Sequence, residues 1–213
     1  MPVWQSIYAE LKDKNFEIIS AAQDSGGEAA AGAIFDEAEV TYTSIIDLHH
    51  SISSLYGLRN VPSAVWIDET GAIVRINEGT FAKEYKFGSM EVGAGGFVAA
   101  LRDWVENGPD SIFAMSRQEI ASQLEPRTEK ESLGEPAFKL AVYFHLTGDK
   151  EKANSYWEQA QDLNPESWNY HRQDWSFTPE EAGKNWRSKF EALGDQPYYA
   201  PLDLPNLEPR SNH

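Results

Sequence analysis

The 213-residue chain contains no cysteine. Without a thiol it cannot form a disulfide, hold zinc through thiolates or use a cysteine nucleophile. Cysteine usage therefore gives no indication of the compartment in which the protein works. Any hypothesis about its function has to accommodate a chain that brings no thiol of its own.

Basic residues are scarce as well. Lys and Arg number 18 against 34 Asp and Glu, which gives this acidic protein a net charge of −16. Nucleic acids and anionic membrane surfaces are bound through basic patches, and the sequence shows none. We therefore expect no nucleic-acid partner and interpret the charge as an aid to solubility.

Long hydrophobic runs are missing too. No apolar segment reaches the roughly 18 residues that a bilayer-spanning helix needs. We therefore expect no membrane span. In the chain as given, no signal peptide precedes the first amphipathic segment.

The sequence offers little for a metal or a cofactor. His49 and His50 are adjacent, and no partner stands at ligand spacing from them, so we interpret them as the start of a short helix with one solvated imidazole. An acidic stretch leaves a paired-carboxylate site open, with a solvated face as the default interpretation. It comprises Asp24, Glu28, Glu37 and Glu39. We predict no cofactor and no metal.

Helix-like and strand-like segments alternate over the first half of the chain. Apolar spacing predicts helices at 2–14, 28–39, 49–56 and 95–107, with Gly57 ending the third. Short apolar runs predict strands at 15–22, 42–48 and 63–68, followed by a turn and a hairpin partner at 72–76. This order predicts an α/β fold with a sheet covered on both faces.

The segment Leu-Tyr-Gly-Leu-Arg-Asn-Val-Pro-Ser-Ala-Val-Trp-Ile-Asp at 55–68 resembles the cis-proline segment of thioredoxin-like proteins. With the helix that starts Met1-Pro2-Val3-Trp4 and the hairpin at 67–74, it is most similar to the TlpA/ResA-like branch, which is related to AhpC/TSA redoxins. The resemblance covers about residues 1 to 107. It implies a thioredoxin-like sandwich, a central mixed sheet flanked by helices, over 1–110.

The resemblance also implies a site. In that family the residue before the cis-proline pairs its backbone with a substrate peptide, which implies a groove shaped by Asn60, Val61, Pro62 and Ser63. Met1, Pro2 and Trp4 would be the remnant of the active-site helix. The alternative, left open, is that the proline is an inherited feature of the fold without present activity.

The departure from the family pattern is at the start. The family's first strands and its Cys-x-x-Cys (or selenocysteine) motif would lie before Met1. Either the chain lacks them naturally, or its start lies inside a longer gene product. If gene prediction read a selenocysteine codon as a stop, it would place the start of the gene at the next Met. An in-frame Trp-Ala-x-x-(Cys or Sec) sequence in the DNA upstream would support this, and its absence would refute it.

Residues 111–195 lack strand patterning and have the spacing of helices. Nine residues fall at the offsets of a tetratricopeptide (TPR) motif, with alanine in place of the usual early Trp. They are Ala137, Leu140, Ala141, Phe144, Gly148, Ala153, Trp157, Ala160 and Pro165. A further helical pair is predicted over 168–193, with Thr178-Pro179-Glu180-Glu181 as a helix start. The tail, 196–213, is predicted to be an extended arm or disordered.

Two functions are consistent with these patterns. The first is a protein related to thiol–disulfide oxidoreductases that is itself inactive, because the redox residue lies upstream of Met1 or is absent. The second is a non-catalytic module, a cysteine-free thioredoxin-like domain joined to a TPR-like repeat. Both imply a protein or peptide partner, in the first case a redox partner. An exposed sheet edge or the helical region would offer an oligomer contact. The family's relatives usually work outside the cytoplasmic membrane.

Overall fold

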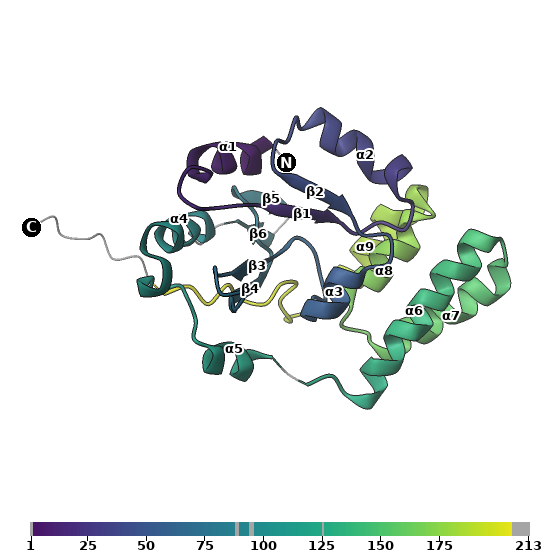
Figure 1. The fold of residues 1–213 in the computed structure, drawn as a ribbon. Helices are drawn as coiled ribbons and strands as arrows, with labels where there is room; N and C mark the ends of the chain where they lie inside the picture. Colours follow the sequence, from purple (N-terminus) through teal and green to yellow (C-terminus); the bar gives the residue numbers. More distant parts are fainter. Residues whose placement is uncertain (1, 88–89, 94–95, 125, 206–213) are drawn as a thin grey trace, which may run out of the picture.

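The computed structural model describes residues 2–87, 90–93, 96–124 and 126–205 (Figure 1). Its first half combines helices and short strands. These elements are α1 (Pro2–Leu11), β1 (Ile19–Ala22), α2 (Glu28–Glu37), β2 (Thr43–Ile46), α3 (Ser51–Tyr56), β3 (Ser63–Ile67), β4 (Ile73–Glu78), β5 (Tyr85–Phe87), β6 (Met90–Val92) and α4 (Phe97–Asn107). The predicted helices and strands of this half are all present.

Several predicted boundaries shift by a few residues. β1 begins at Ile19 instead of residue 15, and α3 begins at Ser51 because His50 takes a left-handed conformation as its N-cap. α4 begins at Phe97, and Gly95, its predicted start, lies outside the described residues. Gly57 ends α3 with a positive φ of 68°, as the sequence predicts for a glycine C-cap. The β5–β6 hairpin has no counterpart in the sequence prediction.

The strands form pairs, and this corrects the expectation of one central mixed sheet. β1 pairs with β2 in parallel, β3 pairs with β4 antiparallel, and β5 pairs with β6 antiparallel. Within the described residues these are three separate two-stranded ladders, because no ladder joins β1 to β3. Both parallel and antiparallel pairing therefore occur, as expected, but the sheet that would connect them is not continuous.

The core of the α/β half lies between the β3–β4 ladder and the helices α1 and α4. The two helices contribute side chains that the helical periodicity places on one face of each helix, and the ladder and the segment after η1 contribute the rest. The buried members are Ile7, Leu11, Trp66, Val74, Phe97, Ala100, Leu101 and Phe113. Trp66 stacks on Trp104 with 5.0 Å between ring centroids. This cluster fixes α1 and α4 against one face of the β3–β4 ladder.

The second half is helical over the described residues. It contains η1 (Gly108–Asp110), α5 (Arg117–Gln123), α6 (Glu129–Thr147), α7 (Lys150–Leu163), α8 (Trp168–Ser176) and α9 (Pro179–Glu191). Capping boxes begin α5 and α6, and Thr178 with Pro179 begins α9 as predicted. Figure 1 shows α6 and α7 side by side as a long helical pair.

The α6–α7 pair has its own apolar cluster. Its buried residues are Ala137, Phe138, Ala141, Val142, Ala153, Trp157 and Ala160. Gly148 ends α6 with a positive φ of 86°, which a glycine adopts without a steric penalty. Alanines at the crossing allow the two helices to approach closely, so the pair is held mainly by small residues and two large aromatic rings.

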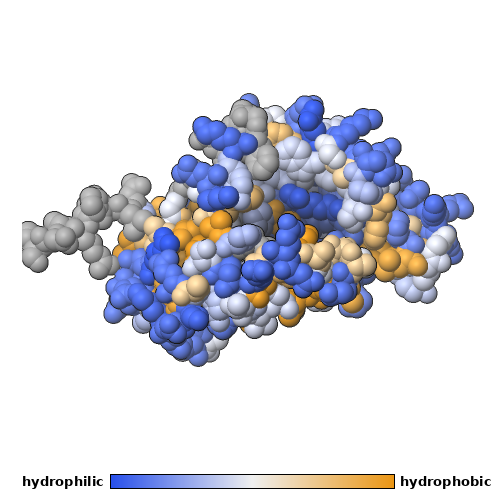
Figure 2. All heavy atoms as spheres, turned by 90° about the horizontal axis from the view of Figure 1, so that it is seen from above, coloured by the Kyte–Doolittle hydropathy of each residue, from blue (hydrophilic) through white to orange (hydrophobic). Residues whose placement is uncertain are grey.

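Part of α6 carries exposed apolar side chains. Leu133, Leu140, Tyr143 and Leu146 are all exposed. Figure 2 shows, on the face seen from above, hydrophobic patches set among hydrophilic side chains. Among the described helices, none combines the length and the apolar character that crossing a membrane requires.

Candidate functional site

The loop before β3 is the centre of the candidate site, and a half-buried carboxylate, that of Glu78, holds it in place. The Val61–Pro62 peptide bond is cis. One carboxylate oxygen of Glu78, at the end of β4, accepts hydrogen bonds from the backbone N–H groups of Arg59 (2.7 Å) and Asn60 (3.0 Å). Burial raises the pKa of Glu78 above its usual value. Glu78 therefore holds the loop to strand β4 at Arg59 and Asn60, just before the Val61–Pro62 bond.

Asn60 lies at the crossing of several contacts. Its side chain is 1% exposed. Its Oδ1 accepts from the Val61 N–H at 2.9 Å and from Arg172 Nε at 3.2 Å, and its Nδ2 donates to the Tyr198 carbonyl at 3.4 Å. Ser63 Oγ donates to the Asn60 carbonyl at 2.7 Å. Asn60 is therefore hydrogen-bonded to Val61 and Ser63, two of the other predicted groove residues, and its own side chain is buried in the protein.

Helix α8 caps the same loop from the side. Asn169 donates from its backbone N–H to the Arg59 carbonyl at 3.1 Å and from Nδ2 to the Leu58 carbonyl at 2.9 Å. Gln173 Oε1 accepts from the Ser25 N–H at 2.9 Å and lies 2.8 Å from His50 Nε2. The helical half therefore supplies polar groups to the loop and to the start of α3.

The C-terminal segment 197–205 reaches the groove itself. The Tyr199 hydroxyl donates to the Val61 carbonyl at 2.9 Å. Because the Val61 N–H is bound by Asn60, both backbone polar groups of Val61 have partners within the chain. Burial is the main cause that raises the pKa of the Tyr199 phenol. In this conformation a peptide pairing with Val61 would have to displace Tyr199.

Gly79 makes room for that tyrosine. Its φ is +66°, and a Cβ there would lie 2.8 Å from Tyr199 Cγ. The next residue, Thr80, is buried and donates its N–H to the Pro62 carbonyl at 3.3 Å. The turn after β4 is therefore shaped both by the proline loop and by the tail.

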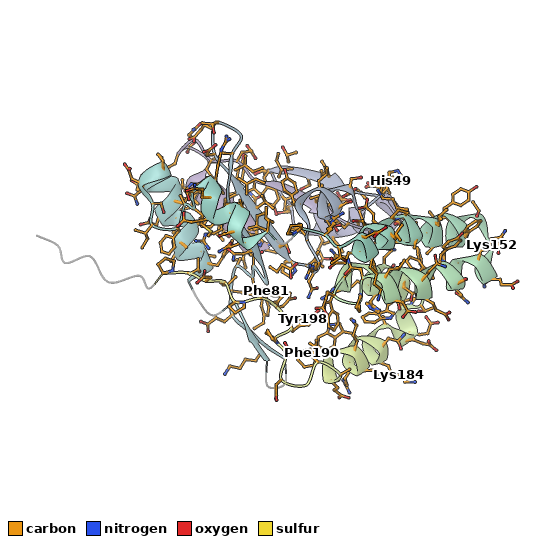
Figure 3. The ribbon with its side chains drawn as sticks, turned by 90° about the horizontal axis from the view of Figure 1, so that it is seen from below. His49, Phe81, Lys152, Lys184, Phe190 and Tyr198 are labelled. Atoms are coloured by element: carbon orange, nitrogen blue, oxygen red, sulfur yellow. The ribbon has the colours of Figure 1, made fainter. Side chains whose placement is uncertain are left out.

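The neighbouring Tyr198 anchors the segment in an aromatic cluster. It is buried, and its ring packs edge-on against Trp168 (4.5 Å between centroids), Trp186 (5.7 Å) and Phe190 (5.5 Å). Its hydroxyl accepts from Trp186 Nε1 at 3.0 Å and from Arg172. Figure 3 shows Tyr198 near Phe190, with Phe81 on its other side. Tyr198 therefore fixes this part of the tail to α8 and α9.

The predicted remnant of the active-site helix contributes to the same region. Pro2 is the first residue of α1, and Met1 lies outside the described residues. Trp4 packs edge-on against Phe97 at 6.3 Å between centroids. Trp4, Val61, Pro62 and Ser63 all line one cavity of about 1950 Å³. The structure therefore brings the helix and the proline loop to one hollow.

The paired histidines have different environments. His49 is exposed and His50 is buried, with desolvation lowering the pKa of His50. Since Gln173 Oε1 can only accept, the His50 proton resides on Nε2, and Nδ1 has no partner. Among the described residues, no three His, Asp or Glu side chains lie together in a way that could hold a metal ion.

Sequence reasoning missed the groups that close over the loop. Glu78, Asn169, Arg172, Gln173 and Tyr199 carry no motif, and they contact the loop region across large sequence separations. One signal was present: Gln-Pro-Tyr-Tyr-Ala-Pro, an aromatic pair between two prolines in a tail without periodicity. Adjacent aromatic residues in such a segment indicate an anchored arm, because aromatic side chains gain most from burial.

The chain is similar in sequence to two curated thiol-disulfide oxidoreductases. The chain is 32% identical over 79 residues to the thiol-disulfide oxidoreductase ResA of Oceanobacillus iheyensis, which covers 37% of this chain and 41% of that protein. It is 27% identical over 92 residues to ResA of Halalkalibacterium halodurans, covering 43% and 52% respectively. The matches thus span about half the length of these curated relatives. No family model matches the chain, and no solved structure matches it.

These matches support a thioredoxin-like protein that is related to thiol–disulfide oxidoreductases. The mixture of small strand ladders and flanking helices in the first half, followed by a helical region, is compatible with that class.

Proposed function

We propose that this protein presents the peptide-binding side of a thioredoxin-like site and does not itself exchange disulfides. Thiol–disulfide exchange needs a thiolate, or its selenium counterpart, as the attacking group. The 213 residues contain no cysteine. A redox group acting with this site would therefore have to come from outside these residues.

The observation that carries the proposal is the position of the Val61 carbonyl. It lies at the wall of the cavity that Trp4 and Pro62 also line, and a side chain, Tyr199, supplies its hydrogen bond instead of the regular ladder of a strand. An extended peptide could take over this bond with a backbone N–H, which is how a strand is added to an exposed edge. The relatedness to ResA supports assigning this role to the loop.

The activity part of the proposal is tested by insulin reduction. The chain is added to insulin and dithiothreitol, and the turbidity of the precipitated insulin chain is followed. We expect the same rate as in buffer with dithiothreitol alone. Turnover above that background would refute the proposal, because it would require a reactive group that these residues are not known to hold.

The peptide-binding part is tested separately, by titrating extended peptides against wild type and Tyr199→Phe. Removing the hydroxyl that competes for the Val61 carbonyl should tighten binding. Tyr143→Phe, which removes the hydroxyl of an exposed tyrosine on α6 that does not line the cavity, is the comparison variant. Equal affinity in wild type and Tyr199→Phe would contradict peptide binding at the Val61 carbonyl.

A non-catalytic binding module is the second candidate, and the exposed apolar side chains of α6 favour it. Under this proposal α6 and α7 form a TPR-like repeat, supported by the burial of Ala137, Ala141, Ala153 and Trp157 and by the glycine turn at Gly148. A single repeat cannot cover its own apolar face. Leu140 and Leu146 would then contact a partner protein.

This second candidate predicts a partner that is lost when the exposed leucines Leu140 and Leu146 of α6 are made polar. Retention of a partner by the immobilised wild-type chain, and its loss with Leu140→Glu/Leu146→Glu, would support it. A matched variant, Leu124→Glu, carries the same change at an exposed leucine after α5. Equal retention by wild type, the double variant and Leu124→Glu would refute a contact at Leu140 and Leu146.

A further inference from the structure

The C-terminal segment 197–205 lies along a track that runs from the loop before β3 to strand β4. At one end of the track the Tyr199 hydroxyl donates to the Val61 carbonyl at 2.9 Å. At the other end the Leu202 carbonyl accepts from Asn77 Nδ2 at 3.0 Å and from Arg75 Nη1 at 3.4 Å. Figure 1 shows this segment, in yellow, passing β4. The segment therefore covers polar groups of both the loop and the strand.

The segment makes these contacts in the way that a bound peptide would. Among the described residues, 197–205 belong to none of the strand ladders. The contacts at Tyr198 and Leu202 use backbone carbonyls, and the contact at Tyr199 uses a phenol. Every polypeptide has backbone carbonyls, and any tyrosine supplies a phenol. Another extended chain can therefore make the same contacts once the segment has left.

The seat of Tyr198 adds a preference for an aromatic side chain. Tyr198 is only 8% exposed, and its ring packs edge-on against Trp168 at 4.5 Å between centroids. Its hydroxyl accepts from Trp186 Nε1 at 3.0 Å and from Arg172. Since Tyr199 occupies the next position, the track accommodates two adjacent aromatic residues.

The prolines of the segment keep it from joining a sheet. They recur at every fourth position, as Pro197, Pro201 and Pro205. A proline has no N–H to give to a ladder and is therefore confined to strand edges and bulges. The segment consequently stays a set of separate contacts, which can be broken without dismantling a strand pair.

The link between α9 and the segment has the properties of a hinge. Residues 194–197 are all exposed, and Gly194 has a positive φ of 57° with nothing within 4 Å of a Cβ built there. Leu202 and Leu204 pack against the core of the α/β half, and both are only partly buried. Segments with an exposed link and little buried apolar surface open at a lower free energy than the whole protein.

We propose that residues 197–205 form an autoinhibitory strap. In the closed state the strap occupies the track, and a ligand binds only after the strap has turned away about residues 194–197. The ligand is an extended polypeptide with two adjacent aromatic residues, and this part rests on the proposed peptide-binding function. A tethered strap competes at an effective concentration on the order of mM. The apparent affinity of a ligand is reduced in proportion to the closed fraction.

Release of the strap is measured with a dye on one introduced thiol, because the chain has no cysteine. Ala200→Cys carries the dye on the strap, and Ser155→Cys carries it on α7; both positions are exposed. We expect the fluorescence anisotropy of the label at 200 to fall at lower urea than the far-UV circular dichroism signal. The anisotropy of the label at 155 should fall together with that signal.

Competition is measured with a peptide that has the sequence of residues 196–204 and blocked ends. Tyr198→Phe keeps the buried ring of the strap but removes the hydroxyl that accepts from Trp186 and Arg172, and it leaves the Val61 contact in place. The peptide should bind this variant about tenfold more tightly than wild type, because the closed state has lost hydrogen bonds. Tyr143→Phe, at an exposed tyrosine on α6, should match wild type.

The same peptide should also lower the anisotropy of the label at 200 in the Tyr198→Phe chain, because it displaces the strap. The label at 155 in that chain should not respond. An unchanged label at 200 in a chain that has bound the peptide would show that the peptide lies elsewhere, and it would overturn the proposal.

Two further results would overturn the strap and leave the proposed function standing. One is loss of anisotropy at 200 that coincides with unfolding, because the segment would then be a permanent part of the fold. The other is equal peptide affinity of wild type and Tyr198→Phe. If the strap is released early and the peptide binds neither chain at about 1 mM, the peptide-binding function is refuted, and the autoinhibitory role with it.

Discussion

The hydroxyl of Tyr199 donates a 2.9 Å hydrogen bond to the backbone carbonyl of Val61, a residue 138 positions earlier in the chain. The bond connects the C-terminal segment to the residue that precedes Pro62. It also occupies the acceptor that the peptide of the proposed function would use. The stability of the tail and the accessibility of the loop are therefore linked at a single atom.

Tyr199→Phe should destabilise the protein by about 1 kcal/mol, since it leaves the half-buried Val61 carbonyl without its donor. For a chain of this length this is a decrease in Tm of about 2–4 °C, measurable by thermal unfolding. Tyr143→Phe, at an exposed tyrosine on α6, is the control and should leave Tm unchanged. Equal effects of the two variants would contradict the assigned bond.

Gly79→Ala should destabilise the chain more than Gly71→Ala. Both glycines have a positive φ, 66° and 82°, so both variants carry a backbone penalty of about 1–3 kcal/mol. A Cβ at Gly79 would also lie 2.8 Å from Tyr199 Cγ, whereas nothing lies within 4 Å at Gly71. The difference in Tm between the variants measures the contact with the tail.

A double substitution separates the two causes. In a Tyr199→Gly background, which also removes the Tyr199 Cβ that would lie 3.1 Å from a Cβ at Gly79, the extra loss at Gly79 should disappear, leaving only the backbone penalty that Gly71→Ala shows. If Gly79→Ala remains more harmful than Gly71→Ala without the tyrosine ring, the clash is not the cause.

Glu78→Gln should change the dependence of stability on pH. Burial raises the pKa of Glu78 above its usual 4.5. At a pH between 4.5 and the raised pKa, the folded chain keeps a proton that the unfolded chain has lost. The contribution of this group to the free energy of unfolding therefore falls as the pH rises from 4.5 to the raised pKa. The neutral glutamine can still accept from the Arg59 and Asn60 N–H groups.

Wild type and Glu78→Gln should therefore have similar Tm values near pH 4, and the variant should gain relative to wild type as the pH rises to 7. Thermal unfolding at several pH values measures this. Glu37→Gln, which removes one charge from the exposed end of α2, is the control. A constant difference between Glu78→Gln and wild type across this range would contradict the burial of a titrating carboxylate.

His50→Asn should reduce the loss of stability in mild acid. Desolvation lowers the pKa of His50 below its usual 6.5, so the unfolded chain binds a proton more readily than the folded chain and stability falls as pH falls below 6.5. Asn tolerates the left-handed conformation of this N-cap. Part of the acid sensitivity should remain, because burial also lowers the pKa of His171 to about 4.

The measurement is the Tm at pH 7 and pH 5 for wild type, His50→Asn and His49→Asn. Only the change at the buried histidine should reduce the difference between the two pH values. The same reduction with His49→Asn would show that the effect comes from surface charge.

The sequence predicts the elements of this fold well and their connections less well. Apolar periodicity locates α1 and α4, Gly57 ends α3, and Thr178-Pro179 begins α9, because each of these signals acts within a few residues. The failure concerns the sheet. Strand patterns show that β1 and β3 exist, but not whether one bonds to the other, since ladder partners are chosen by contacts distant in sequence.

The candidate site divides in the same way. The loop at Asn60 to Ser63 is recognisable from its local sequence. Glu78, Asn169 and Tyr199 were not predicted, because a lone carboxylate, amide or phenol has no spacing rule, and its role is set by the backbone group that it meets after folding.

The hydrogen bonds between α8 and the loop before β3 limit which segments of this chain can be exchanged with those of another protein. The Leu58 and Arg59 carbonyls are bound by Asn169. An exchange of the C-terminal helices for those of another protein would leave these carbonyls bare unless the incoming helix carried an amide at the same place. The loop before β3 therefore depends on α8 for these two hydrogen bonds, and successful chimaeras should keep the loop and α8 from the same parent.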